Sequence, residues 1–185
     1  MLKNATKEEL NSLLKDWLKI CESQGDEGVV FAQDIEDKIK GLIEDIQKEE
    51  FFAYILSDEE SKEKECVALL DVIRALPHSD VGWLKIFDMT ITPKCTLNGG
   101  NYEEIAKALQ SVFMESLRLL MNEKYKDIKE IKIFARNEIT KKLFEDIVID
   151  VDLIEELSGI GVVMFFKAKW LILRKKDLSP SQKEI

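Results

Sequence analysis

The chain has 185 residues, of which 45% are hydrophobic and 34% are charged, and its 36 acidic against 27 basic side chains give a formal net charge of −9. This length suffices for one hydrophobic core, and the composition excludes a disordered or fibrous protein. The negative charge disfavours nucleic acid and anionic membrane as partners unless basic residues cluster locally. The basic run Arg174-Lys175-Lys176 follows a strand-like run and fits a solvated strand end, so we expect neither partner.

The first part of the chain carries two helical patterns. Thr6 followed by Glu9 forms a capping box, and the apolar residues after it recur on one face, which predicts a helix over 7–22. After a predicted loop at 25–28, apolar residues from Ile35 onward repeat the pattern as far as about Lys48. We therefore expect two amphipathic helices at the start.

Three strand-like runs follow. Residues 51–56 and 66–76 are rich in aromatic and branched apolar side chains, and 83–92 is a third run that ends at Pro93. The charged stretch 57–65 and the turn formers after Pro77 separate them. This pattern predicts three strands, of which the first two pair as antiparallel neighbours.

From the strand that ends before Pro93 onward, the chain is predicted as strand, helix, strand, short helix and long strand. Asn101 with Glu104 forms a cap pair for a long helix, whose apolar stripe runs from Ile105 to Leu120. Residues 128–135 alternate as a strand, and 138–145 fits a short helix behind Asn137. The ambiguous stretch 147–157 favours a strand and then a turn. The remaining predictions are a long strand over 162–173, a single domain over 1–175 and a flexible tail over 176–185.

The cysteines indicate neither disulfides nor a metal site. Cys21, Cys66 and Cys95 are odd in number and far apart, and His78 is the only histidine. No stretch reaches about 18 consecutive apolar residues, as a membrane helix would need. We expect a cytoplasmic protein without a metal cofactor.

Two local patterns join this order of elements to a known family. Residues 137–144, Asn-Glu-Ile-Thr-Lys-Lys-Leu-Phe, directly follow a strand, and residues 93–101, which include Gly99 and Gly100, precede the long helix. Together with the order of elements over roughly 50–173, they resemble the GNAT superfamily of acyl-CoA N-acyltransferases. The resemblance implies an α/β fold with a central mixed, mostly antiparallel sheet flanked by helices.

The same resemblance implies a site for acetyl-CoA. Gly99, Gly100 and Asn101 would hold the pyrophosphate at the start of the long helix, where backbone N–H groups and the helix dipole favour an anion. Thr96 stands where the family has a basic residue. Asn137 would lie near the cofactor, and Phe144 stands at the position of the family's tyrosine but has no hydroxyl to act as an acid.

Acyl transfer also needs a donor for the oxyanion and a base for the amine. The family resemblance assigns the donor to the backbone of Met89, Thr90 and Ile91 in the third strand. Asp88 and Asp71 are carboxylates inside apolar runs, where burial would raise their pKa, and Asp88 is the candidate base. Tyr54 and Cys95 are further polar candidates, whereas His78 fits an exposed turn.

Two functions remain open at this point. One is transfer of an acetyl group from acetyl-CoA to a primary amine on a small molecule or basic peptide; the other is a catalytically inactive GNAT-like binding or scaffold module, suggested by Thr96 and Phe144. An unrelated α+β sheet is a third possibility. Trp170 and Phe165 in the final strand are residues of the core or of an interface, so a homodimer is one expectation.

Overall fold

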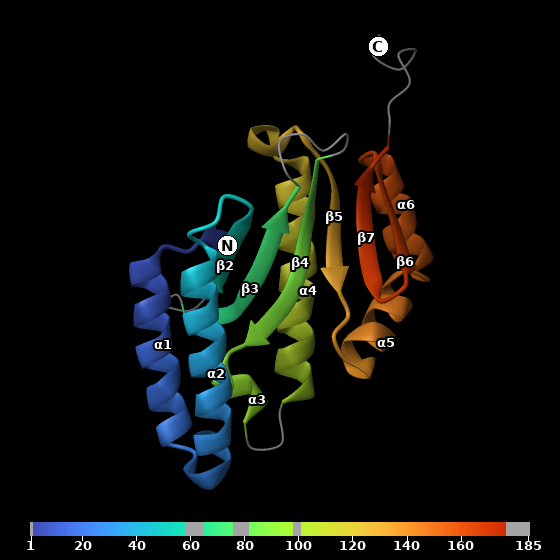
Figure 1. Cartoon of the computed structure of the whole chain (residues 1–185). Coiled ribbons are helices and arrows are strands. Elements are labelled where there is room, and N and C mark those ends of the chain that lie inside the picture. Colours follow the sequence, from blue (N-terminus) through green and yellow to red (C-terminus); the bar gives the residue numbers. More distant parts are fainter. Residues whose placement is uncertain (1, 58–64, 76–81, 98–100, 177–185) are drawn as a thin grey trace. The chain divides into compact units, whose positions relative to one another are not determined.

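The computed structural model describes residues 2–57, 65–75, 82–97 and 101–176 (Figure 1). Its strands are hydrogen-bonded in the order β1-β2-β3-β4-β5-β7-β6. The chain divides into two compact units, one formed by Met1–Ile73 with Phe87–Glu115 and the other by Arg74–Ile86 with Ser116–Ile185. Each unit is described by itself below, and the single domain predicted for 1–175 stays a prediction.

The first unit combines two helices with the first strands. Its elements are β1 (Leu2–Asn4), α1 (Lys7–Glu22), α2 (Gly25–Asp45), β2 (Phe51–Ser57), β3 (Cys66–Arg74), the second half of β4 (Gly82–Ile91), α3 (Pro93–Thr96) and most of α4 (Tyr102–Met121). β2 pairs antiparallel with both β1 and β3, as expected for the two predicted strands. The short strand β1 was not predicted, because three residues carry no periodic signal.

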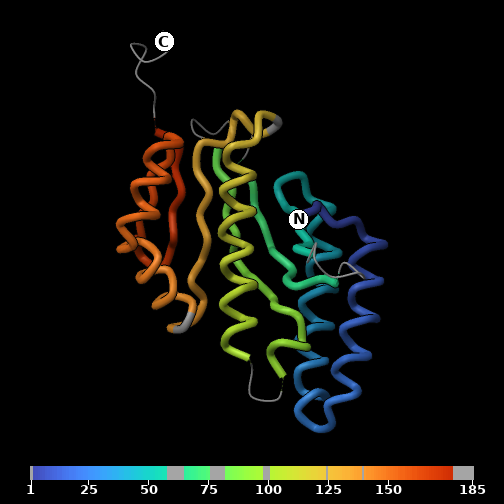
Figure 2. Tube along the Cα trace, turned by 180° about the vertical axis from the view of Figure 1, so that it is seen from behind, coloured from blue at the N-terminus to red at the C-terminus, as the bar shows by residue number. Residues whose placement is uncertain are grey.

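The helices α1 and α2 lie side by side, as both views of the trace show (Figures 1 and 2). Their apolar stripes form one core with residues of β2 and β3, and its fully buried members include Leu10, Ile35, Ile39, Ala53 and Leu69. The capping box predicted at the start of α1 is present, with the Thr6 hydroxyl accepting from the N–H of Glu9 and the Glu9 carboxylate accepting from the N–H of Thr6.

The loop predicted at residues 25–28 is wrong, because α2 already begins at Gly25. Gly25 has φ of +66°, a conformation that glycine adopts without the usual steric cost, and this allows the chain to turn from α1 straight into α2. Two glycines in four residues resemble a loop in sequence, but here the first makes the turn and Gly28 lies within the helix.

The second unit contains a four-stranded part of the sheet and three helical segments that lie between its strands in the chain. Beside the first half of β4 and the end of α4 it contains η1 (Glu123–Tyr125), β5 (Ile128–Phe134), α5 (Glu138–Ile147), α6 (Val151–Gly159), β6 (Val162–Lys167) and β7 (Trp170–Lys175). β4 pairs parallel with β5 over Gly82–Ile86, and the β5–β7 and β6–β7 pairs are antiparallel. The predicted mixed, mostly antiparallel sheet with helices is therefore confirmed.

Two predictions in the second unit are wrong. The long strand predicted over 162–173 is a hairpin, β6 and β7, whose turn places Ala168 at φ 47° and Lys169 at φ 68°. Neither residue is a glycine or asparagine, so the usual turn signal is missing. Residues 147–157 form the end of α5 and the helix α6, which Asp150 caps by accepting from the N–H of Leu153, and not a strand.

Within the described residues, no helix is both long enough and apolar enough to span a bilayer. The same part of the chain contains no group of three or more His, Cys, Asp or Glu side chains that could hold a metal ion. The predicted tail from residue 177 onward and His78 lie outside the described residues.

Candidate active site

Asp88 lies on the half of β4 that belongs to the first unit, and both of its carboxylate oxygens have partners. Oδ2 lies 3.1 Å from the ammonium nitrogen of Lys38 on α2. Oδ1 accepts a hydrogen bond of 3.0 Å from the N–H of Met89. The side chain of Asp88 is 21% exposed, so the carboxylate is half-buried yet within reach of a ligand. Asp88 therefore presents a carboxylate that already holds a primary ammonium group.

The Lys38 ammonium also approaches Thr90, whose hydroxyl oxygen lies 3.4 Å from it. Lys38 is a residue that the sequence analysis missed, although a signal exists. It stands three residues after Ile35 and four before Leu42, so helical spacing places it beside the buried stripe of α2. A lysine at such a position lays its aliphatic part along apolar surface, and here its ammonium group meets the Asp88 carboxylate.

Asp71, on β3, is the second carboxylate of this region. Its Oδ1 atom is buried and finds no hydrogen-bond partner among the residues that the structure describes. Burial raises the pKa of Asp71, and the nearby charges of Asp45 and Asp88 raise it further. Asp71 faces the same side of the β2–β3 ladder as its partner Ala53, which lies in the core shared with α1 and α2. Asp71 is thus within electrostatic reach of Asp45 and of Asp88, and Lys38 binds Asp88.

Replacing Asp71 with asparagine is expected to stabilise the protein at neutral pH by about 1 kcal/mol, because it removes a buried charge that lacks a partner. A carboxyl whose pKa is raised by folding contributes stability below its ordinary value of 3.8 and loses that contribution as the pH rises through the folded value. The advantage of the variant should therefore be present at pH 7 and disappear below about pH 4.

Urea unfolding of the wild type and of Asp71→Asn at both pH values measures this difference. Asp34→Asn, an exposed position on α2, is the matched control and should change the free energy of unfolding by less than about 0.5 kcal/mol. A variant that is less stable than the wild type at pH 7 would contradict the assignment of Asp71 as an unfavourable buried charge.

The predicted oxyanion donors, Met89, Thr90 and Ile91, all lie on β4 and are half-buried. The N–H of Met89 is engaged by the side chain of Asp88. For this N–H to bind a carbonyl oxygen, the Asp88 carboxylate must first turn away from it. The assignment of the donor to one of these three residues stays a prediction.

The predicted phosphate loop is only partly described, since Gly99 and Gly100 lie outside the described residues. Pro93–Thr96 forms the short helix α3, in which the Thr96 hydroxyl donates to the carbonyl of Thr92 at 3.3 Å. Asn101 caps α4 as predicted, with its Oδ1 accepting from the N–H groups of Glu103 at 3.1 Å and Glu104 at 3.4 Å. These two N–H groups are therefore already satisfied by a side chain.

Two neighbouring residues of the loop are held in other contacts. Lys94, a candidate to replace the missing basic residue, is exposed and lies 3.0 Å from Glu65. Cys95 is buried, and burial, together with a hydrogen bond involving Glu104, raises the pKa of its thiol to about 11. A thiol with that pKa is protonated at neutral pH, which argues against Cys95 as a nucleophile.

Asn137 and Phe144 lie in the second unit. Asn137 caps α5, and its Oδ1 accepts from both the N–H of Thr140 at 2.8 Å and the hydroxyl of Thr140 at 3.0 Å. These two bonds account for the small residue Thr140 three positions after Asn137. Phe144 is 1% exposed and packs in the core. A role in binding the cofactor stays a prediction for both residues.

Tyr54 is buried at 6% exposure and pairs with Leu70 across the β2–β3 ladder, whereas Asp71 pairs with Ala53. Successive residues of a strand point to opposite faces, so Tyr54 and Asp71 lie on opposite sides of the sheet. The structure brings Asp88, Asp71 and Thr90 into one region of the first unit but does not bring Tyr54 to them.

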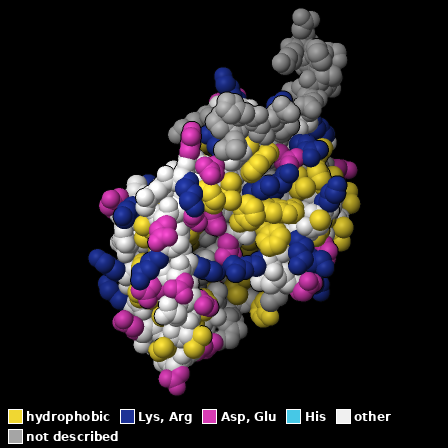
Figure 3. All heavy atoms as spheres, in the orientation of Figure 1, with side chains coloured by type: hydrophobic (Ala, Val, Ile, Leu, Met, Phe, Trp, Pro, Cys, Tyr) yellow, Lys and Arg dark blue, Asp and Glu magenta, His cyan; other side chains and the backbone are white. Residues whose placement is uncertain are grey.

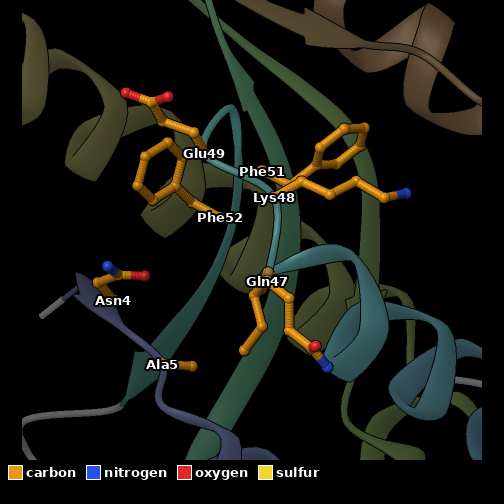
Figure 4. A pocket seen from close by; sticks show the side chains of 8 residues that line it. Asn4, Ala5, Gln47, Lys48, Glu49, Phe51 and Phe52 are labelled. Carbon is orange, nitrogen blue, oxygen red and sulfur yellow. The ribbon is translucent and has the colours of Figure 1, made fainter.

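A pocket of about 290 Å³ lies elsewhere in the first unit, between β1 and the segment that leads from α2 into β2. Figure 4 shows Lys48 extended beside the ring of Phe51, with its nitrogen 5.0 Å from the ring centre. The other lining residues are Asn4, Ala5, Ile46, Gln47, Glu49 and Phe52. None of the predicted site residues lines this pocket.

No family model matches the chain, and no curated protein matches it. Solved structures do resemble it. AtaTR bound with AcCoA shares 14% identity at a TM-score of 0.42, covering 93% of this chain and 90% of its own. A probable acetyltransferase shares 15% at 0.44, covering 80% and 87%. An aminoglycoside acetyltransferase from an uncultured soil metagenomic sample, in complex with sisomicin, shares 10% at 0.40, covering 79% and 83%. Two of these three structures are named acetyltransferases, and all three identities are too low to assign residue roles.

Proposed function

We propose that the protein transfers an acetyl group from acetyl-CoA to a primary amine. The observation that carries this proposal is the half-buried carboxylate of Asp88, which holds the ammonium group of Lys38 at 3.1 Å on the strand predicted to polarise the thioester. A site that binds one primary ammonium is suited to bind another of the same chemistry. The acceptor would be a small-molecule amine or the lysine side chain or terminus of a basic peptide.

The carboxylate of Asp88 has the chemistry needed to prepare an acceptor amine. An ammonium group must lose one proton before its nitrogen can attack, and Asp88 would take that proton. The neutral nitrogen then forms a bond to the carbonyl carbon of the thioester while the carbon–sulfur bond breaks, and the nitrogen releases its second proton to solvent to leave the neutral amide. Coenzyme A leaves as the thiolate and is protonated by solvent, since Phe144 offers no acid.

The surrounding acidic groups favour a cationic acceptor over a neutral or anionic one. Asp71 is within electrostatic reach of both Asp45 and Asp88, so this region carries a negative potential, and the half-burial of Asp88 limits its screening by water. Lys38 offsets part of this charge in the absence of an acceptor. We propose that an incoming ammonium competes with Lys38 for Asp88.

The proposed binding site for acetyl-CoA consists of residues 99–101 and the start of α4. The N-terminus of a helix attracts phosphate through its N–H groups and its dipole. The capping bonds of Asn101 satisfy two of these N–H groups, so the cofactor would rely on the remaining ones or displace the Asn101 side chain.

Isothermal titration of the full chain with acetyl-CoA and with coenzyme A tests this proposal. We expect both to bind with a Kd below about 1 mM, and Gly99→Glu, which adds a side chain and a negative charge, to weaken both by at least about tenfold. Gly159→Ala, where an added Cβ meets nothing within 4 Å, is the control that should bind normally. If neither acetyl-CoA nor coenzyme A bound at millimolar concentration, the proposed acetyltransferase activity would be contradicted.

A binding or scaffold module is the second candidate, and two observations favour it. The N–H of Met89 is occupied by Asp88, and Phe144 supplies no hydroxyl. Such a module would bind without turning over substrate. Release of coenzyme A thiol with any member of a panel of amines, lost in Asp88→Ala, would exclude it.

A further inference from the structure

One face of the sheet in the second unit carries a set of aromatic side chains. In the β4–β5, β5–β7 and β6–β7 registers, alternate residues of the four strands fall on one face, and its rings are Trp83, Phe134, Phe165 and Trp170. The residues between them, such as Leu84, Ile131 and Leu171, are at most 3% exposed and face the core. The four rings are half-buried instead, so this is the solvent-facing side.

The same face carries basic side chains from all four strands, namely Lys85, Lys132, Lys167 and Arg174. We call these four residues and the four rings the aromatic–basic face. Figure 3 shows hydrophobic and basic side chains gathered over β5 and β7 in this view. The four cations are far apart in sequence, and the pairing of the strands brings them together.

The positive charge of this face is only partly balanced. The carboxylate of Glu130, which is 5% exposed, binds Lys132 at 2.7 Å and the Nε of Arg174 at 2.6 Å. Burial opposes its ionisation, but these hydrogen bonds outweigh burial and lower the pKa of Glu130. Among the described residues of the four strands, this face thus combines one carboxylate with four cations, in a chain whose formal net charge is −9.

Two of the lysines lie directly opposite each other. Lys85 on β4 is the register partner of Lys132 on β5, and both side chains are half-buried. Like charges at such a cross-strand pair are destabilising. Glu130 offsets part of this repulsion through its ion pair with Lys132, and an anion bound above the two lysines would offset it further, so the face favours a negatively charged partner over an uncharged one.

The rings and cations of the face alternate in contact. The nitrogen of Lys85 lies 4.3 Å from the centre of the Trp83 ring and 5.9 Å from that of Trp170. Arg174 lies 5.2 Å from the ring of Phe165, and the rings of Phe134 and Trp170 are 5.0 Å apart. Cations bind phosphates, and aromatic rings stack with planar bases. Single-stranded nucleic acid carries both phosphates and bases on one chain.

Other partners fit this face less well. An acidic peptide would pair its carboxylates with the cations, but those carboxylates would not stack on the four aromatic rings. A second copy of the chain, joined face to face about a two-fold axis, would bring the same four cations against each other. We propose that the aromatic–basic face binds single-stranded nucleic acid, with phosphates on Lys85, Lys132, Lys167 and Arg174 and bases stacked on the tryptophans.

The proposal is independent of acetyl transfer, since binding is measured without acetyl-CoA. Fluorescence anisotropy with a labelled oligouridylate of about 12 nucleotides, within the usual range of site sizes, gives the affinity. The double variant Lys85→Glu/Lys167→Glu should weaken binding by at least about tenfold and flatten the dependence of log K on log salt by about 1 to 2 units. Lys142→Glu, an exposed charge reversal on α5 away from the face, should change the affinity less than about twofold.

Tryptophan emission distinguishes stacking from simple attraction of charge. Trp17 is 2% exposed in the core of the first unit, so quenching by the oligonucleotide reports on Trp83 and Trp170. We expect quenching in the wild type and in Trp17→Phe. Lys167→Glu alone, at an exposed position at the end of β6, repeats the affinity test with little risk to folding.

Three results would overturn the proposal. The first is an affinity for the face variants equal to that of Lys142→Glu. The second is binding without quenching of tryptophan emission. The third is equal competition by a polyglutamate peptide of similar charge, which would assign the face to an acidic protein segment instead.

Discussion

Asp88→Asn is expected to lower the rate of acetyl transfer by about 10² to 10⁴-fold while leaving the Kd for acetyl-CoA within about twofold. The amide keeps the size of the side chain, and its oxygen can still accept the hydrogen bond from the N–H of Met89. It cannot take a proton from an ammonium group. The loss should therefore appear in turnover and in acceptor binding, not in the binding of acetyl-CoA.

The measurement is the release of coenzyme A thiol with a panel of cationic amines at saturating acetyl-CoA, after an acceptor has been found. Asp71→Asn is the informative comparison, because Asp71 also lies near Asp88 but its buried Oδ1 meets no hydrogen-bond donor among the described residues. We expect it to reduce the rate less than Asp88→Asn does. If Asp88→Asn kept more than about half of the wild-type activity, Asp88 would not be the base.

The sequence predicted the individual carboxylates of the candidate site but not the way they are joined. Asp71 and Asp88 interrupt apolar strands, and that is a local signal which can be read without a structure. The link of Asp88 to Lys38 depends on how α2 packs against β4, and the two partners are 50 positions apart in the sequence. No periodicity within one element contains that information, because the contact is tertiary.

The elements with long apolar stripes were predicted well, whereas the segments governed by turns were not. The helices α1, α4 and α5 begin at the capping residues Thr6, Asn101 and Asn137, which the sequence identifies. The β6–β7 hairpin was missed because Ala168 and Lys169 adopt positive φ without the residues that favour it. Tertiary pairing of β7 with β5 outweighs this local preference.

The aromatic–basic face illustrates the same limit for surfaces. Net charge and the run Arg174-Lys175-Lys176 led us to expect no nucleic-acid partner. The register instead places Arg174 on a face with Lys85, Lys132 and Lys167, which come from other strands. Strand alternation could have shown that each residue is on one face of its own strand, but the order of the strands was needed to bring them together.

The largest expected effect on stability comes from Gly28→Ala. A Cβ atom at position 28 would lie 2.0 Å from the carbonyl oxygen of Cys21 and 2.9 Å from its carbonyl carbon. Both are backbone atoms of a buried residue at the end of α1, so they cannot move aside as a flexible side chain would. We expect a loss of about 3 kcal/mol in the free energy of unfolding, as the α1–α2 pair must separate.

Gly41→Ala is the matched control, because Gly41 lies in the same helix and a Cβ there meets nothing within 4 Å. Alanine is the better helix former, so this variant should gain about 0.5 to 1 kcal/mol. Urea unfolding followed by circular dichroism measures both changes. Opposite signs for the same substitution would show that Gly28 is required by the close approach of α1 to α2 and not by helix propensity, whereas similar changes would contradict the close contact at Cys21.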